Sequence, residues 1–372
     1  MSREAAARGT TPLGEILAAR IAREGPIGVA DYMQACLHDA AHGYYRKQTA
    51  IGRAGDFITA PEISQVFGEL IGLWCAVVWQ QMGQPAKLRL IELGPGRGTL
   101  MRDALRAGRL VPAFLKAVSV ELVESNATLV AAQRAALAGE TIPLTWRDDL
   151  EPGNDPVIVL ANEFLDTLPV TQWVYAGDAW HPRRVGMDAS GAFVFDDSAA
   201  ADPKFHPPAV GSPVAGAIFE TRAVSGLMRK LHGLAPVCAA LFIDYGHAQP
   251  GFGDTLQAIR GHTFDDPLRA PGEADLTAHI DFAAFAAQAR SQGFACDGPL
   301  AQGAFLGRLG IVERASRLMA ANAAHAGRIE AGVTRLLSPG GMGSRFLALG
   351  LRSPGLPPLP GFDPVDSRGA PP

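Results

Sequence analysis

The sequence predicts an α/β fold built on a mostly parallel β-sheet with helices on its faces. Two observations predict it. Short apolar runs alternate with helix-like segments between residues 88 and 161, which is the pattern of consecutive βα units. The run at 157–161, Val-Ile-Val-Leu-Ala, is apolar throughout, as expected of a central strand that is covered on both faces.

The sheet region follows an N-terminal part that favours helices. This part covers residues 1–85 and ends in an apolar helix at 63–82. Strands and helices then alternate. The expected strands are 88–93, 118–123, 144–146 and 157–161, and the expected helices between them are 99–107 and 127–137.

After Pro169 the pattern changes to short strands separated by turns, which indicates an antiparallel segment inserted at about 170–235. The α/β pattern returns with an apolar run at 237–243. We therefore expect three regions: a helical N-terminal region with a lid loop (1–85), a ligand-binding domain (86–352) and a proline-rich, disordered tail (353–372). The other expected elements are strands at 173–175, 184–187, 192–195, 294–300 and 345–349, an exposed loop at 197–215 and a helix near 223–234.

Composition and charge exclude several classes of protein. The chain has 372 residues, of which 48% are hydrophobic and 19% charged, so it is globular rather than disordered. Its net charge of -4 gives no overall attraction to nucleic acid. The four cysteines are scattered without a C-x-x-C pair, which favours free thiols in a reducing compartment over a zinc site or disulfides. We expect no bound metal.

No run of about 18 apolar residues is present, so we expect no stable insertion into a membrane and a cytoplasmic location. Recurring arginines at positions 3, 8, 20 and 23 leave a transit peptide open as an alternative. The oligomeric state is open as well, because the apolar helix at 63–82 suits either a core or a dimer face.

The strand at 88–93 leads into the turn Gly94-Pro95-Gly96-Arg97-Gly98 and then into a helix. Glycines at such a turn let backbone N–H groups approach a ligand that a Cβ would keep away. The spacing differs from the G-x-G-x-x-G of dinucleotide enzymes, and Glu92 stands on the strand itself. An acid at that point suits a ligand with a cationic amino group, and S-adenosyl-L-methionine is such a ligand.

Acidic residues follow the next two strands, where ligands of open α/β sheets bind. Glu124 ends the second strand, 26 residues beyond Gly98, at a position suited to accept hydrogen bonds from ribose hydroxyls. Its alternative role is to stabilise the N-terminus of the following helix. Asp148 and Asp149 end the third strand and could accept from an adenine amino group, with capping of the loop as the alternative.

The fourth strand ends in Ala161-Asn-Glu-Phe-Leu-Asp166. Asn162, Glu163 and Asp166 at the mouth of a central strand are costly unless they are paired or face a cleft. A helix cap would explain Asn162 alone. We therefore expect the two carboxylates to hold or deprotonate a cationic acceptor nitrogen. Upstream, Glu62 either complements a helix dipole or belongs to a lid over the ligand.

Seven stretches of the sequence occur together, and in the same order, in one known family. From about residue 26 to 350 the chain resembles the class I S-adenosylmethionine-dependent methyltransferases of the mitochondrial dysfunction protein A type, which include an arginine methyltransferase of respiratory complex I assembly. The glycine turn is generic to the superfamily, whereas the block at 55–69 is specific to this family. The matching stretches are 55–69 (GDFITAPEISQVFGE), 92–100 (ELGPGRGTL), 161–169 (ANEFLDTLP), 244–247 (DYGH), 270–278 (APGEADLTA), 302–306 (QGAFL) and 342–346 (MGSRF).

The resemblance implies a seven-stranded, mostly parallel Rossmann-like sheet with a helical N-terminal addition, and S-adenosyl-L-methionine as cofactor. It also implies roles for the motif residues, with the lid loop at 55–62 closing the site and the turn at 162–166 facing the acceptor. Glu163 is the first choice for the catalytic carboxylate, supported by Asp166 and Glu62. The implied cofactor-binding residues are Glu92, Gly94, Pro95, Gly96 and Gly98 at the methionine part, Glu124 at the ribose, Asp148 and Asp149 at the adenine, and Asn162.

The implied substrate is a protein arginine on a quinone-site subunit of respiratory complex I, methylated during assembly of the complex. Family members carry Asn or His at position 162, which moves the catalytic role from Asn162 to Glu163 and Asp166. Two alternatives stay open at this stage. One is a non-catalytic scaffold that binds the cofactor during assembly, and the other is a methyltransferase that acts on a small molecule or another residue type.

Overall fold

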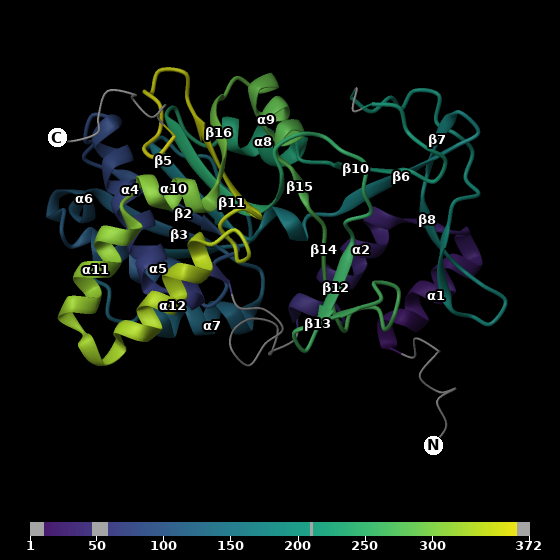
Figure 1. Cartoon of the computed structure of the whole chain (residues 1–372), viewed down its shortest axis with the longest axis horizontal. Coiled ribbons are helices and arrows are strands. Elements are labelled where there is room, and N and C mark those ends of the chain that lie inside the picture. Colours follow the sequence, from purple (N-terminus) through teal and green to yellow (C-terminus); the bar gives the residue numbers. More distant parts are fainter. Residues whose placement is uncertain (1–10, 47–58, 209–210, 363–372) are drawn as a thin grey trace. The chain divides into compact units, whose positions relative to one another are not determined.

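The computed structural model describes residues 11–46, 59–208 and 211–362. The chain folds into two compact units, and it passes between them several times (Figure 1). The division expected from the sequence, at residues 85 and 352, stays a prediction. The first unit consists of Met1–Ile58, Phe164–Val224 and Gln249–Asp281, and the second unit consists of Thr59–Glu163, Ser225–Ala248 and Phe282–Pro372.

Within its described residues, the second unit contributes seven strands to its main sheet, in the order β16-β17-β11-β5-β2-β3-β4. The five strands from β11 to β4 are parallel, whereas β17 is antiparallel to both of its neighbours. The strand order reverses at β2, which has β3 on one side and β5 on the other. The strands are β2 (Leu88–Leu93), β3 (Val118–Val123), β4 (Leu144–Arg147), β5 (Val157–Asn162), β11 (Cys238–His247), β16 (Ala295–Ala301) and β17 (Phe346–Arg352).

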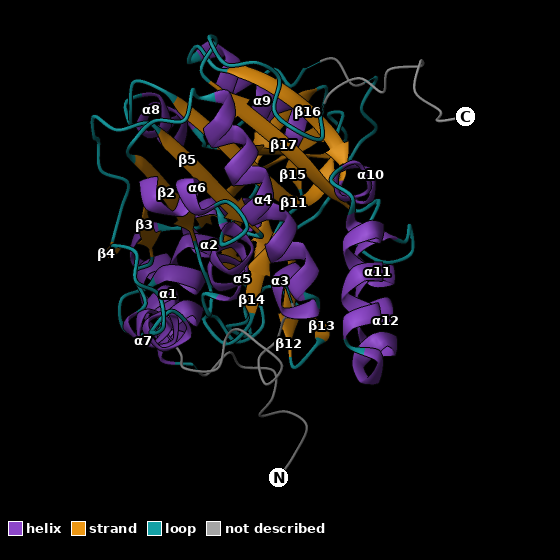
Figure 2. Ribbon diagram, turned by 90° about the vertical axis from the view of Figure 1, so that its left-hand side faces the viewer, coloured by secondary structure: helices purple, strands orange, loops and turns teal. Residues whose placement is uncertain are grey.

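Helices cover both faces of this sheet, because alternate residues of the apolar strands point to opposite sides. Leu241 of β11 belongs to the same core cluster as Trp74 of α4, whereas the next residue, Phe242, packs its ring against Phe285 of α9. Figure 2 shows the strands and helices of the unit in contrasting colours. The helices are α3 (Ala60–Ile63), α4 (Gln65–Gln81), α5 (Thr99–Gly108), α6 (Pro112–Ala117), α7 (Ala127–Ala136), α8 (Ser225–His232), α9 (Phe282–Ser291), α10 (Gln302–Arg308), α11 (Ile311–Ala321), η4 (Ala323–His325) and α12 (Ala326–Leu337).

Helix α4 lies unusually close to α5. A Cβ on Gly72 would come within 2.3 Å of the Ala104 carbonyl oxygen, so only glycine permits this approach. Glu69, the last residue of the family-specific block, is 2% exposed and accepts hydrogen bonds from Arg106 of α5 at 3.0 Å and Arg314 of α11 at 2.7 Å. Paired in this way, the buried carboxylate ties three helices together instead of destabilising the fold.

The first unit has its own core and three small antiparallel sheets, in the orders β1-β8-β9, β10-β6-β7 and β13-β12-β14. Helices α1 and α2 contribute much of this core, including Leu17 and Tyr32, which are 2% and 0% exposed. The elements are α1 (Pro12–Glu24), β1 (Ile27–Gly28), α2 (Val29–His38), η2 (Tyr44–Arg46), η3 (Leu165–Thr167), β6 (Val170–Ala176), β7 (Ala179–Pro182), β8 (Arg184–Met187), β9 (Phe193–Asp196), β10 (Ile218–Arg222), β12 (Gln257–Arg260), β13 (Thr263–Asp265), β14 (Asp275–Thr277) and β15 (Ile280–Asp281).

The structure confirms the mostly parallel sheet, the helical N-terminal addition and the added antiparallel strands. It differs from the expected disorder of the tail over residues 353–362. Leu359 there is fully buried, and the Trp74 indole N–H donates to the Pro360 carbonyl at 3.0 Å, because the leucines among the prolines find an apolar surface to pack on. Residues 363–372, and positions 55–58 of the expected lid loop, lie outside the described residues.

We predict that Gly72→Ala lowers the free energy of unfolding by about 1–3 kcal/mol, because the added methyl group must push α4 away from α5. Urea unfolding followed by circular dichroism measures the effect. Gly226→Ala in α8 is the matched control: a Cβ there meets nothing within 4 Å, so the change should raise stability by up to about 1 kcal/mol through helix propensity. Equal stability of Gly72→Ala and the native chain would contradict this account of the packing.

Candidate functional site

The glycine turn joins β2 to α5 at the point where the strand order reverses. Gly94, Gly96 and Gly98 have φ values of 60°, 54° and 78°, in the left-handed region that other residues rarely adopt. The Gly98 N–H donates to the Pro95 carbonyl at 2.8 Å and closes the turn. Gly98 also precedes the first residue of α5 without a capping side chain, so the turn and the helix N-terminus together present backbone N–H groups.

Glu92 lies on β2 just before this turn and is 3% exposed. Its Oε2 atom is buried and has no hydrogen-bond partner among the residues that the structure describes. Burial raises the pKa of Glu92 from 4.5 to about 8, because the buried environment disfavours the charged form. A buried carboxyl group in this state suits a ligand that brings a positive charge.

Gln133 of α7 connects three parts of the site. Its side-chain amide donates to the Gly96 carbonyl at 2.8 Å and to Glu124 Oε2 at 3.3 Å. Its carbonyl oxygen accepts from the Trp146 indole N–H at 3.0 Å. Glu124 is oriented further by the Asn126 N–H, which donates to its Oε1 at 2.8 Å. Residues from the ends of β2, β3 and β4 are therefore joined through one side chain.

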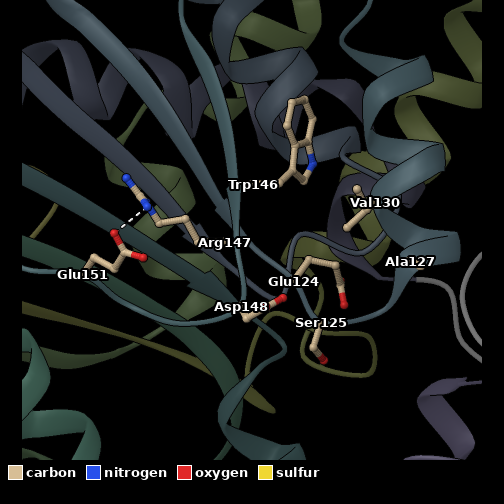
Figure 3. Close-up of a pocket in the computed structure, with 8 residues that line it drawn as sticks. All are labelled: Glu124, Ser125, Ala127, Val130, Trp146, Arg147, Asp148 and Glu151. Carbon is tan, nitrogen blue, oxygen red and sulfur yellow. Dashed lines mark ion pairs between the residues drawn. The ribbon is translucent and has the colours of Figure 1, made fainter.

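A pocket of about 450 Å³ opens beside these residues. Figure 3 shows Glu124, Ser125 and Asp148 gathered at the ends of β3 and β4, whereas Arg147 turns towards Glu151, with which it forms an ion pair. The residues that line the pocket are Glu124, Ser125, Ala127, Val130, Trp146, Arg147, Asp148 and Glu151.

The two aspartates after β4 have different surroundings. Asp148 lines the pocket. Asp149 does not line it and instead forms an ion pair with Lys230, whose hydrogen bond is the main cause that lowers the pKa of Asp149. The structure therefore brings Asp148, but not Asp149, together with Glu124.

The turn after β5 places Glu163 in an unusual backbone conformation, with φ at 52°. A residue with a Cβ is strained there, and such strain concentrates at functional sites. The Oε1 atom of Glu163 accepts from the Ala60 N–H at 2.9 Å and from the Asn162 side-chain amide at 3.0 Å. The carboxylate is thereby fixed between the end of β5 and the first residue of α3.

Helix α3 also carries Glu62, whose carboxylate accepts a hydrogen bond from the Thr99 hydroxyl. Thr99 is the first residue of α5, immediately after the glycine turn. The four residues of α3 are thus bonded at one end to Glu163 and at the other to the helix that follows Gly98. Glu62, Asn162 and Glu163 all belong to the second unit, like the glycine turn.

Asp166 belongs to the first unit, in the short helix η3, and is 5% exposed. Its backbone carbonyl accepts from the Ala278 N–H at 3.2 Å.

Sequence reasoning missed Gln133, Trp146 and Thr99 as members of the site. Only their positions in the sequence could have indicated a role in the site: Trp146 lies near the end of a strand, two residues before Asp148, and Thr99 follows the last glycine of the turn. Gln133 lies within a helix and gives no such signal.

Comparison with known proteins places this site in a family. A profile of the family described as "Putative S-adenosyl-L-methionine-dependent methyltransferase" matches residues 70–300, which is more than half of the chain. The chain belongs to this family. It is therefore an S-adenosyl-L-methionine-dependent methyltransferase with a class I Rossmann-like fold, and S-adenosyl-L-methionine is its cofactor.

Relatives of this methyltransferase extend over most of its length. It is 34% identical to the zebrafish (Danio rerio) protein arginine methyltransferase NDUFAF7, mitochondrial, over 89% of this chain and 84% of that protein. It is also 34% identical to the human protein of that name, over 92% of this chain and 84% of that protein. A Burkholderia thailandensis protein whose crystal structure holds S-adenosyl-homocysteine is 27% identical, with a TM-score of 0.82 over 99% of this chain and 97% of that one.

The second unit of the methyltransferase fits such a cofactor. The glycine turn offers backbone N–H groups, and the unpartnered Oε2 of Glu92 suits an ammonium group. The pocket is lined by Glu124 and Asp148, whose carboxylates have the chemistry to accept from hydroxyl and amino donors. Among the described residues, no helix is long and apolar enough to cross a membrane, and no three His, Cys, Asp or Glu side chains gather in a way that could hold a metal ion.

We predict that Glu92→Gln makes the methyltransferase more stable than the native chain at alkaline pH. The unfolded carboxyl group ionises above about pH 4.5, whereas the folded one keeps its proton up to about pH 8, so the native free energy of unfolding falls as pH rises between these values. The glutamine does not titrate. We expect a gain on the order of 5 kcal/mol at pH 8.5 that falls below about 1 kcal/mol near pH 5, measured by urea unfolding at both values. A gain that is the same at both pH values would contradict the buried, protonated state of Glu92.

Proposed function

We propose that this methyltransferase transfers the methyl group to an arginine side chain of a protein, a quinone-site subunit of respiratory complex I, during assembly of that complex. The observation that carries the proposal is the fixed carboxylate of Glu163 at the mouth of the central strand β5, in a strained conformation. The similarity to protein arginine methyltransferases at 34% identity over about nine-tenths of the chain supports the same acceptor.

The cofactor is held by residues of the second unit. Gly94, Pro95, Gly96 and Gly98 would border its methionine part, where the glycines let the backbone approach closely. Glu92 would pair with its amino group. The remaining assignments follow the pocket beside β3 and β4. Glu124 would accept from the ribose hydroxyls and Asp148 from the adenine amino group. Asn162 would border the site from the end of β5. The role of Asp149 beside the adenine stays a prediction from the sequence, since Asp149 pairs with Lys230 and does not line the pocket.

An arginine acceptor needs a carboxylate because its guanidinium group is protonated near neutral pH. When bound, the cofactor supplies an electrophilic methyl group on a sulfonium centre. Glu163 accepts hydrogen bonds from the guanidinium, which orients one nitrogen, and takes the proton that this nitrogen loses as the new bond to carbon forms. The Ala60 N–H and the Asn162 amide keep one oxygen of Glu163 in place during this exchange.

Two further carboxylates support Glu163 in this proposal. Glu62 holds α3 against the start of α5 through Thr99, so the Ala60 N–H that contacts Glu163 stays in position. The supporting role of Asp166, the second acid of the 161–169 motif, stays a prediction from the sequence, since this residue belongs to the first unit. The cytoplasmic location expected from the sequence also remains a proposal, whereas the relatives named above carry the word mitochondrial in their names.

We predict that binding of S-adenosyl-homocysteine at pH 7 releases a proton from Glu92. The free enzyme holds Glu92 protonated, because its pKa is about 8, and the ligand's ammonium group favours the charged carboxylate, so binding strengthens as pH rises towards 8. Titration calorimetry in buffers with different ionisation enthalpies counts the protons. The native enzyme should release up to about one proton more than Glu92→Gln. If the native enzyme and Glu92→Gln released the same number of protons, Glu92 would not be the group that pairs with the amino group of the ligand.

We predict that Glu163→Gln lowers arginine methylation at least about 100-fold, because an amide orients the guanidinium poorly and cannot take its proton. Affinity for S-adenosyl-homocysteine should stay within about threefold, since the change lies on the acceptor side. The measurement incubates the full-length enzyme with S-adenosyl-L-methionine and the purified quinone-site subunit, and mass spectrometry locates the added methyl groups. Calorimetry gives the cofactor affinity.

Glu313→Gln on the exposed face of α11 is the matched control for this change, and its activity should equal that of the native enzyme. Full methyl transfer by Glu163→Gln with unchanged cofactor affinity would overturn the role of Glu163. If the native enzyme consumes S-adenosyl-L-methionine with a small molecule or modifies another residue type, the arginine acceptor is wrong while the methyltransferase assignment stands.

A further inference from the structure

Gln133 is a buried polar side chain that is bonded to two residues lining the pocket, Glu124 and Trp146, and to the glycine turn. It is fully buried in α7, and its three polar bonds reach the glycine turn, the ribose-binding acid and the pocket wall. The backbone nearby is equally close-fitting. A Cβ on Gly98 would lie 3.3 Å from Gln133 Cα and 3.4 Å from its Cγ, so the glycine turn packs directly on this residue.

The chemistry of the three bonds requires a primary amide. The carbonyl of Gly96 and the carboxylate of Glu124 both need a donor, and the Trp146 indole N–H needs an acceptor. Glutamine offers two N–H donors and one carbonyl oxygen, which matches this set. Glutamate lacks the donors and would place a second negative charge beside Glu124, and methionine has the same length but makes none of these bonds.

Trp146 is held in place from two sides. Its indole N–H is bonded to Gln133, and the guanidinium of Arg134 lies 4.0 Å from the centroid of its ring. Trp146 lines the pocket (Figure 3), so its orientation sets the shape of the pocket beside Asp148. Removing the bond from Gln133 would release one of these two constraints and leave the indole N–H to find another partner.

We propose that Gln133 is a positioning residue that fixes the glycine turn, Glu124 and Trp146 at the spacing which one elongated cofactor requires. This inference rests on the proposed function only where that assigns the turn to the methionine part and Glu124 to the ribose. A ligand that contacts all three groups at once loses affinity when any of them moves, because the binding site must then be ordered on binding. Gln133 therefore acts on cofactor affinity without needing to touch the cofactor.

The first test compares the affinity of S-adenosyl-homocysteine for full-length Gln133→Met and Gln302→Met by titration calorimetry. Gln302 is a matched control: it is also fully buried in the second unit, and its amide donates to the Leu336 carbonyl at 3.1 Å, outside the residues that line the pocket. We expect affinity to fall at least tenfold in Gln133→Met and to change less than twofold in Gln302→Met. Thermal unfolding of both variants without ligand measures the general cost of losing a buried glutamine.

The second test uses Gln133→Glu and needs only that the chain folds. At pH 8 the introduced carboxylate is ionised and faces Glu124, whereas at pH 5.5 the neighbouring charge favours its protonated form, which can donate. The ratio of variant to native dissociation constants should therefore rise at least fivefold from pH 5.5 to 8. The same ratio for Gln133→Met should stay constant, because methionine does not titrate. A purely structural loss of packing would give no such difference between the two variants.

Each outcome has a definite meaning. Affinity within twofold of native in folded Gln133→Met overturns the inference, as does a ratio for Gln133→Glu that does not change with pH. If Gln133→Met does not fold, the pH series of Gln133→Glu decides alone. Ligand binding needs no methyl acceptor, so a wrong arginine proposal leaves this test intact, and failure of the native enzyme to bind S-adenosyl-homocysteine would reject the proposed cofactor site itself.

Discussion

The site depends on the sharp turn that the chain makes after β2. All six residues of β2 are buried between β3 and β5, so the strand's carboxyl end has a fixed position. Three glycines in the left-handed region then bring the chain into α5 within a few residues. Other functional contacts attach to this turn: Gln133 bonds to the carbonyl of Gly96, and Glu62 bonds to Thr99 just beyond Gly98. A bulkier residue in the turn would displace all of these together.

Buried carboxylates in the second unit differ in whether an arginine pairs with them, and this difference bears on the ligand. Glu121 accepts from Arg89 at 2.6 Å and Arg147 at 3.1 Å, and those arginines outweigh burial and lower its pKa. Glu69 is paired in a similar manner with arginines of two other helices. Glu92 has no such partner on its Oε2 atom among the described residues, and its pKa rises to about 8. Unlike Glu69 and Glu121, Glu92 forms no ion pair with an arginine in the described part of the chain, which is consistent with the proposal that it pairs with a cationic group of the cofactor.

Sequence reasoning recovered the sheet because its signals are local. Strands such as Val118–Val123 are short apolar runs between helical segments, and periodicity alone identifies them. The strands of the first unit were recovered less completely: β12–β14 are only three or four residues long and only partly apolar, so their pairing is set by tertiary contacts. The packed segment around Leu359 was missed for a related reason, since its proline-rich composition resembles that of a disordered tail.

Some residues of the candidate site could likewise be predicted from local sequence signals, and others could not. Residues in the glycine turn and at the ends of strands could be predicted, because a ligand-binding motif and a parallel sheet constrain where they lie. Gln133 could not, because a glutamine within a helix is ordinarily a solvated surface residue. Its role appears only when α7 packs on the turn and places the amide between Gly96 and Trp146. Asp149 is the opposite case. The sequence predicts the same contact with the adenine for Asp148 and Asp149, and only the folded chain places Lys230 beside Asp149.

Helix α3 connects Glu163 to the start of α5, which in the proposed function are the acceptor side and the donor side of the reaction. The strained backbone at Glu163 is held by its own N–H, which donates to the Ile243 carbonyl at 2.9 Å, and by the bond from the Ala60 N–H to its carboxylate. Glu62 bonds the same four-residue helix to the start of α5. Methyl transfer requires the electrophilic carbon and the attacking nitrogen to be aligned closely, and misplacement by about 1 Å is costly. In the proposed mechanism, the four-residue helix α3 contributes to that alignment, because it is bonded both to the start of α5 and to the Glu163 carboxylate.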